Sequence, residues 1–413
     1  MIVSEKFRAP FGLEGQRVYG DVDAAAVAGD EPAIRTVDEI FDSAIRARAS
    51  DVHIEPFAGG GRVRERVDGI LRESRRLSAR LLPRVLSRIK LLAGMDIADR
   101  RLPQDGRYAV ERPGGSIDAR VCSIPTIEGE KLAVRLLDVH ARIPALEALG
   151  MPPAMAARYR ALIHAPAGFV VVCGPTGSGK TTTLYASISE RNVSGAQICS
   201  IEDPVEIRIA GVAQVQINVR AGLTFGAGLR SFLRQDPNVI SIGEMRDVET
   251  ASVATSAALC GQLVLTTLHS NDALCALDRL VELGVSPRGV GAAISGIVSQ
   301  RLVRRLCTRC KRAARAGPGS QRFGVPPDAV VAEAAGCERC DGTGYRGRKG
   351  VFELVAMSLG LRHAVETQAP PSVVSDAAAG AGYEPLAGAA GRLILEGECA
   401  VEEATRVLGS PAG

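Results

Sequence analysis

The sequence predicts an α/β protein whose main sheet is mostly parallel and covered by helices on both faces. Short apolar segments with strand character alternate with helical stretches between residues 169 and 267. That alternation is typical of a parallel sheet buried on both sides. A glycine-rich loop also joins the first of these strands to the helix that follows it. Because ligands of such sheets bind where the strands end at their carboxyl side, we expect the functional residues there.

The composition is that of a globular protein with two or three domains. The chain has 413 residues, of which 46% are hydrophobic and 23% are charged, and a single core rarely grows to that size. Its 50 basic and 46 acidic residues leave a net charge of +4, which is too small to indicate a nucleic-acid partner by itself. No apolar stretch approaches the roughly 20 residues that span a bilayer, and the start lacks a signal-peptide core. We therefore expect a cytoplasmic protein that reaches a membrane only through a partner.

The order of the expected elements separates a small first domain from a larger second one. Residues 1–31 are weakly patterned and predict a flexible N-terminal lead-in. Residues 32–140 predict a small α/β domain, and residues 148–413 predict the domain of the main sheet. In the first domain we expect helices at 34–49 and 81–92 and strands at 52–54, 62–67, 116–123 and 131–137. In the second domain we expect strands at 169–173, 197–201, 239–242 and 262–267.

The glycine-rich loop Gly174–Thr181 fits the phosphate-loop pattern G-x-x-x-x-G-K-[ST] and lies between an apolar strand and a helix at 181–191. Its backbone N–H groups can curl around a polyphosphate, and the helix N-terminus adds partial positive charge. We expect Lys180 to reach the β- and γ-phosphates of ATP and Thr181 to bind Mg²⁺. The alternative is a glycine-rich turn without a ligand. The expected nucleotide-binding residues are Gly174, Pro175, Thr176, Gly177, Ser178, Gly179, Lys180, Thr181 and Thr182.

Three ionisable side chains follow the other strands of the main sheet and are candidate catalytic residues. Glu244 comes at the tip of an apolar strand, where it could orient or deprotonate the attacking water. Glu202 could hold the metal or the water through its hydration shell, and His269 could contact the γ-phosphate. For Glu202 the alternative is a capping role in the turn around Pro204.

These motifs, in this order and spacing, resemble the secretion-ATPase superfamily, which includes the ATPases of type II secretion and of type IV pilus assembly. Ile201–Glu206 is similar to that family's aspartate box, Val239–Asp247 to its Walker B segment with Glu in place of Asp, and Leu265–Asp272 to its histidine box. Residues 49–56 and 100–107 resemble the family's second N-terminal domain. The resemblance implies a RecA-like P-loop NTPase core, a smaller N-terminal α/β (PAS-like) domain and a tetracysteine zinc subdomain.

The resemblance also gives several arginines an expected role. In related ATPases, matching arginines approach the bound phosphates, some of them from another domain or subunit, and a guanidinium suits phosphate oxygens. The alternative is ordinary surface ion pairing, which is the commonest fate of an arginine. The arginines concerned are Arg120, Arg135, Arg230, Arg234 and Arg246.

Four of the ten cysteines form two C-x-x-C units that are separated by 26 residues. Each such turn presents two sulfurs, and four thiolates can enclose one Zn²⁺ in a closed structural site. Disulfides are the competing interpretation, against which a reducing cytosol argues, and another metal such as iron stays open. We expect zinc at Cys307, Cys310, Cys337 and Cys340, within an excursion at 305–346. The resemblance agrees, because type II secretion and many pilus-extension ATPases carry such a subdomain.

The resemblance implies an ATP-hydrolysing motor that powers type II secretion at the inner membrane. The expected partners are other copies of the chain in a homo-hexamer, an inner-membrane platform protein and further secretion components, with peripheral membrane association. Type II secretion ATPases usually carry a further N-terminal docking domain, and only about 30 weakly patterned residues precede the second domain here, so we expect docking to differ. The alternatives are a pilus-extension ATPase, a non-hydrolysing nucleotide-gated scaffold and a nucleic-acid motor, the last disfavoured by 4% aromatic residues and no Trp.

Overall fold

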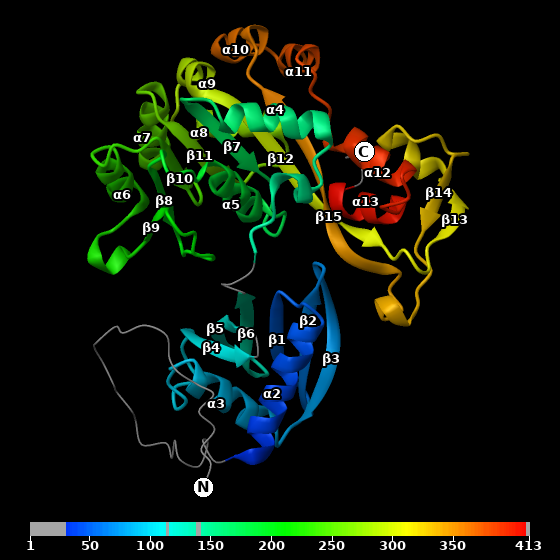
Figure 1. The fold of residues 1–413 in the computed structure, drawn as a ribbon. Helices are drawn as coiled ribbons and strands as arrows, with labels where there is room; N and C mark the ends of the chain where they lie inside the picture. The colour runs from blue at the N-terminus through cyan, green and yellow to red at the C-terminus, as the bar shows by residue number, and fades with distance from the viewer. Residues whose placement is uncertain (1–29, 113–114, 138–141, 410–413) are drawn as a thin grey trace. The chain divides into compact units, whose positions relative to one another are not determined.

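The computed structural model describes residues 30–112, 115–137 and 142–409. The chain divides into two compact units, residues 1–141 and 142–413 (Figure 1). The expected lead-in at 1–31 lies outside the described residues apart from its last two positions.

The first unit packs two helices on an antiparallel sheet. In chain order its elements are α2 Glu31–Arg46, β1 Asp51–Phe57, β2 Gly60–Val67, β3 Ile70–Ser78, α3 Leu82–Leu92, β4 Gln104–Arg112, β5 Gly115–Thr126 and β6 Gly129–Leu137. The strand order is β3-β2-β1-β6-β5-β4. Asp30 caps the N-terminus of α2, and its side chain accepts a hydrogen bond from Ala33 N at 3.2 Å.

Alternation along β1 decides which face of this sheet is the core. Val52 and Ile54 are fully buried with residues of α2 and α3, whereas Asp51 and His53 point to the other face. The strands predicted at 52–54, 62–67, 116–123 and 131–137 lie within β1, β2, β5 and β6. No sequence pattern had indicated β3 or β4. Strand β3 pairs with β2 through a register shift at Val63/Arg64, so its polar and apolar residues do not alternate cleanly.

The second unit is built on a mostly parallel sheet with strand order β15-β12-β7-β11-β10-β8-β9. Its strands are β7 Gly168–Cys173, β8 Ile198–Glu202, β9 Ala213–Gln216, β10 Val239–Ile242, β11 Leu263–Leu268, β12 Ile294–Leu306 and β15 Tyr345–Ala356. Only β15 runs antiparallel to its neighbour among these described strands. The predicted strands at 169–173, 197–201, 239–242 and 262–267 correspond to β7, β8, β10 and β11.

Helices cover both faces of this sheet. Alternate residues of β7 enter two separate cores: Phe169 and Val171 pack with α7, α8 and α9, and Val170 packs with α4 and α5. The helices are α4 Pro153–Ile163, α5 Lys180–Arg191, α6 Phe225–Phe232, α7 Val248–Leu259, α8 Ala273–Glu282 and α9 Pro287–Ala293, and η1 Leu146–Leu149 and η2 Val219–Ala221 are short 3-10 turns.

Strands β12 and β15 continue beyond the sheet into a C-terminal part with its own small core (Figure 1). Between them lie β13 Arg312–Arg315, η3 Pro318–Phe323, β14 Val330–Glu333 and η4 Glu338–Cys340. After β15 come α10 Leu359–Glu366, α11 Pro371–Gly380, α12 Leu386–Leu395 and α13 Val401–Leu408. Within the described ranges we found no helix with the length and apolar character needed to cross a membrane.

Candidate active site

The phosphate loop joins the carboxyl end of β7 to the N-terminus of α5. Gly174, Gly177 and Gly179 have φ values of +150°, +77° and +90°, a backbone conformation that favours glycine. A Cβ on Gly177 would meet no atom within 4 Å, so the loop is open on that side. Within the described residues, no side chain caps the first turn of α5. Its backbone N–H groups are therefore free for an anion.

The side chains of the loop also fit a phosphate ligand. Lys180 is 9% exposed, and its ammonium donates to Gly174 O at 2.8 Å and Pro175 O at 2.9 Å. Burial lowers the pKa of Lys180, because the charged form loses hydration. Ser178 Oγ is buried without a hydrogen-bond partner among the described residues. A polyphosphate would give the Lys180 ammonium anionic oxygens in place of neutral carbonyls, and it would give Ser178 Oγ a hydrogen-bond partner. Thr181 and Thr182 follow on α5.

Two further strand ends lie beside this loop because β7, β11 and β10 are neighbours in the sheet. Gly174 N donates to Leu268 O at 3.2 Å, and Met245 N donates to Thr267 O at 3.1 Å. The loops that carry Lys180, His269 and Glu244 are thus tied to one another by backbone hydrogen bonds.

Glu244 is the centre of an ionic cluster at these strand ends. Arg246 Nη2 donates to Glu244 Oε2 at 2.7 Å, and His269 Nε2 lies 3.1 Å from Glu244 Oε1. Burial raises the pKa of Glu244, but Arg246, His269 and Lys180 together bring that pKa below its ordinary value. The carboxylate is therefore ionised at neutral pH, as a group that orients or activates water requires.

Glu202, at the end of β8, occupies a different environment. It is 4% exposed. Ser200 Oγ donates to its Oε1 at 2.7 Å, Gln214 Nε2 donates to the same oxygen at 3.1 Å, and Tyr185 Oη donates to Oε2. Tyr185 Oη also accepts from Glu206 N at 3.0 Å. Glu202 thus holds the segment after β8 against α5.

The arginines occupy two separate units. Arg230 lies on α6 and pairs with Glu249. Arg234 is exposed and lies two residues after the end of α6. Both expected arginines of the first unit lie on its sheet, where Arg120 of β5 is directly opposite Arg135 of β6. Arg135 Nε also pairs with Asp51 at 3.0 Å.

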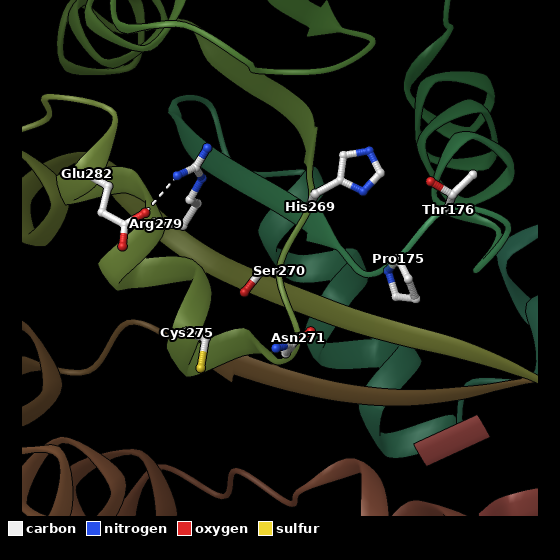
Figure 2. Close-up of a pocket in the computed structure, with 8 residues that line it drawn as sticks. All are labelled: Pro175, Thr176, His269, Ser270, Asn271, Cys275, Arg279 and Glu282. Atoms are coloured by element: carbon white, nitrogen blue, oxygen red, sulfur yellow. Dashed lines mark hydrogen bonds and ion pairs between the residues drawn. The ribbon is translucent and has the colours of Figure 1, made fainter. Parts of the chain in front are cut away.

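A cleft of about 490 Å³ opens between the phosphate loop and α8. In Figure 2, His269 lies between Arg279 and Thr176 in this view, and an ion pair joins Arg279 to Glu282 at 2.7 Å. The residues that line it are Pro175, Thr176, His269, Ser270, Asn271, Cys275, Arg279 and Glu282. No sequence pattern had indicated the last three, which line the cleft only because α8 starts directly after the histidine loop, residues 269–272.

The two C-x-x-C units converge in the C-terminal part. All four Sγ atoms lie within 4.8 Å of one another, and Cys307–Cys337, Cys310–Cys340 and Cys337–Cys340 have Sγ separations of 3.9, 3.8 and 3.7 Å. Four thiolates at about 2.3 Å from a tetrahedral Zn²⁺ would be about 3.8 Å apart, whereas a disulfide needs about 2.05 Å.

Backbone groups also surround these sulfurs. Gly336 N donates to Cys310 Sγ at 3.3 Å, and Gly344 N donates to Cys340 Sγ at 3.2 Å. Burial raises the pKa of Cys340, but N–H groups of Cys337 and Gly344 outweigh it and bring that pKa to about 6. The donor set and its surroundings therefore fit a zinc ion.

A phosphate loop on a mostly parallel α/β sheet, with a carboxylate and an imidazole at the adjacent strand ends, defines a P-loop nucleoside-triphosphate-binding protein. The family model described as "Type II/IV secretion system protein" matches residues 26–406. The chain belongs to this family, which confirms the resemblance seen in the sequence and the predicted α/β core with its tetracysteine cluster.

Individual relatives agree with this assignment. The chain is 44% identical over 376 residues to Type II secretion system protein HxcR of Pseudomonas aeruginosa, and this match covers 91% of this chain and 77% of the relative. It is 42% identical over 421 residues to Type IV pilus assembly ATPase PilB of Myxococcus xanthus, and this match covers 97% of this chain and 74% of the relative. Among solved structures, the pilus retraction motor PilT with bound ADP superposes with a TM-score of 0.61 at 25% identity, covering 90% of this chain and 97% of that one.

Proposed function

We propose that the chain binds ATP at Gly174–Thr182 and hydrolyses it, and that this hydrolysis powers type II protein secretion. The observation that carries the proposal is the Glu244 carboxylate, held by Arg246 and in contact with His269 at the strand ends beside the phosphate loop. A loop that only bound a nucleotide would not need an ionised carboxylate held at this position. A nucleotide hydrolase needs one to orient or deprotonate water.

Each polar group of the site has a role in this proposal. Glu244 holds the attacking water, and His269 faces the γ-phosphate while it keeps Glu244 in place. Lys180 leaves its two carbonyl partners to bind phosphate oxygens. A magnesium ion, which Thr181 would help to hold, neutralises phosphate charge when it is bound. Arg246 keeps Glu244 ionised.

Glu202 has a positioning role, because its carboxylate oxygens already accept hydrogen bonds from Ser200, Gln214 and Tyr185. The other arginines act on phosphates of the same or a neighbouring subunit, in a homo-hexamer. An arginine supplied by another domain or subunit would couple hydrolysis to movement. These residues are Arg120, Arg135, Arg230 and Arg234.

The tetracysteine cluster holds one structural Zn²⁺ in the proposed protein. Four sulfurs close the coordination shell, so the metal stabilises the segment between β12 and β15 and leaves no position for a substrate. Cys307, Cys310, Cys337 and Cys340 are its ligands.

The protein works in the cytoplasm at the inner membrane, where it moves a platform protein of a type II secretion system. The 44% identity to a relative named for type II secretion supports this choice. A type IV pilus-extension motor is the second candidate, since a relative named as a pilus assembly ATPase is 42% identical. The tetracysteine cluster fits both.

Stimulation of ATP turnover tests this function. The purified chain should hydrolyse ATP slowly, and it should do so faster in the presence of acidic phospholipid or the cytoplasmic domain of a type II platform protein. Single-stranded DNA should have no effect. Stimulation by DNA alone would favour a nucleic-acid motor instead.

A further inference from the structure

Strand β12 passes directly beneath the phosphate loop. It pairs in parallel with β7, and Ser299 lies opposite Cys173, the last residue of β7. The next two residues, Gln300 and Arg301, therefore extend past the point where β7 ends and the loop begins. Both are buried, with exposed fractions of 1% and 9%.

The Gln300 side chain joins the two ends of the curved part of the loop. Its Nε2 donates to Ser178 O at 2.6 Å, and its Oε1 accepts from Thr183 Oγ1 at 2.7 Å. Lys180 and Thr181 lie between these two attachment points in the sequence. Because the amide bonds on both sides of them, it fixes the backbone from which both side chains project.

The close approach of Gln300 also explains two glycines of the motif. A Cβ on Gly174 would lie 2.6 Å from Gln300 O, and a Cβ on Gly179 would lie 2.9 Å from Gln300 Nε2. Neither distance is tolerated by a real side chain. Gly174 thus leaves room for the backbone carbonyl of Gln300, and Gly179 leaves room for its side-chain amide.

Arg301 anchors the histidine loop to the same strand. Its Nη2 donates to Asn271 O at 2.5 Å, and its Nη1 donates to Gln300 O at 3.1 Å. The loop that carries Lys180 and the loop that carries His269 are therefore attached to consecutive residues of β12.

We propose that Gln300 is a positioning residue for nucleotide binding, which holds the phosphate loop in its binding shape through Ser178 and Thr183, and that Arg301 sets the histidine loop against it. This inference rests on the proposed ATP binding. Loss of the Gln300 contacts should weaken binding of the phosphates more than it slows the chemical step, because Glu244 and His269 lie on other strands.

Thr183→Val is the main test, because it is nearly isosteric and removes one of the two attachment points. The variant leaves Gln300 Oε1 buried without its donor, which weakens the attachment of the loop to β12. We expect the Kd for a fluorescent ATP analogue and the KM for ATP both to rise about tenfold, with kcat changed by less than about threefold. Thr183→Ser keeps the hydroxyl and should restore binding to within about twofold of the unmodified chain.

Thr255→Val is the matched control. Thr255 Oγ1 also makes a buried hydrogen bond, to Ala251 O at 2.8 Å, but it does so on α7. Equal Kd values for Thr183→Val and Thr255→Val would overturn the proposal, as would a Thr183→Val protein that binds like the unmodified chain. If Thr183→Val does not fold, Gln300→Met serves instead: it must weaken binding at least tenfold, and unchanged binding overturns the proposal. An unmodified chain that ignores ATP would contradict the proposed function itself, which is a separate result.

Discussion

His269 Nε2 lies 3.1 Å from Glu244 Oε1, across the ends of the adjacent strands β11 and β10. This contact joins the two groups that the proposed hydrolysis needs most, a carboxylate for the water and a side chain facing the γ-phosphate. The backbone hydrogen bond from Met245 N to Thr267 O holds the same two loops together.

Replacement of Glu244 by Gln should separate nucleotide binding from turnover. The amide keeps the shape of the side chain but cannot accept a proton from water, so kcat should fall by about two to four orders of magnitude. The Kd for ATP, measured by calorimetry, should change by less than about threefold. Glu398→Gln, which removes a carboxylate near the tetracysteine part, should leave kcat unchanged. A Glu244→Gln protein with normal turnover would exclude Glu244 as the catalytic base.

The acid limb of kcat/KM should report the ionisation of Glu244 in the free protein. Burial raises its pKa, but Arg246, His269 and Lys180 together bring that pKa below the ordinary carboxyl value of 4.5. Protonation of Glu244 should therefore reduce kcat/KM only below about pH 4.5. Arg246→Gln removes the main group that lowers this pKa, so its acid limb should move to higher pH. An unmoved limb would contradict the role given to Arg246.

Much of this site could be predicted from the sequence, because its parts are local motifs. The glycines of the phosphate loop and the polar residues at strand ends are visible in a single stretch of chain. In contrast, Gln300 lies 122 residues from Ser178, and only the pairing of β12 with β7 brings them together. The burial of Glu202 likewise depends on the packing of Tyr185 on α5 and on the pairing of β8 with β9, which carries Gln214.

The fold was predictable to a similar degree. The strand at 169–173 is a continuous hydrophobic run, and the strand at 239–242 is apolar apart from the buried Ser241, since both faces of each strand are buried. Strand β12 was missed because Ile294 follows directly on α9, so no turn residue separates the two elements. In the first unit, β3 was missed because its three arginines and a register shift hide its alternation.

The tetracysteine cluster should bind one zinc ion per chain. Metal analysis of the purified protein should find about one equivalent of zinc, with none of the visible absorption that iron–thiolate sites give. Cys340→Ser should lose most of the metal and make residues between β12 and β15 sensitive to protease, because metal binding there contributes folding free energy. The exposed Cys122 lies in the first unit, so Cys122→Ser should retain the metal. Metal retained in Cys340→Ser would rule out the four-sulfur site.

Glu55 should make the stability of the first unit depend on pH. Its carboxylate accepts hydrogen bonds from Arg62 and Arg64 and pairs with Lys131. Although burial raises its pKa, these partners bring the pKa of Glu55 to about 2, below its ordinary value of 4.5. The stabilisation is thus complete above about pH 4.5 and is lost as the pH falls towards 2.

Glu55→Gln should lower the free energy of unfolding of the first unit by about 2–3 kcal/mol at pH 7 and weaken its dependence on pH below 4.5. Hydrogen exchange of the β1 amides in the full chain would measure this. Glu31 pairs with Arg35 at 3.7 Å with an 83% exposed side chain, so Glu31→Gln should change the free energy by less than about 0.5 kcal/mol. Equal effects of the two substitutions would contradict the importance of the Glu55 cluster.

Calorimetric titration of the full chain with ATP and Mg²⁺ tests the central claim most directly. The phosphate loop, with Lys180 buried against its own carbonyl groups, should bind ATP with one site per chain. Lys180→Ala removes the cation that would contact the phosphates, so binding should weaken by about tenfold or more in a protein that remains folded. A folded, unmodified chain that shows no heat of binding when titrated with MgATP would contradict the account. A Lys180→Ala protein that binds MgATP equally well would also contradict it.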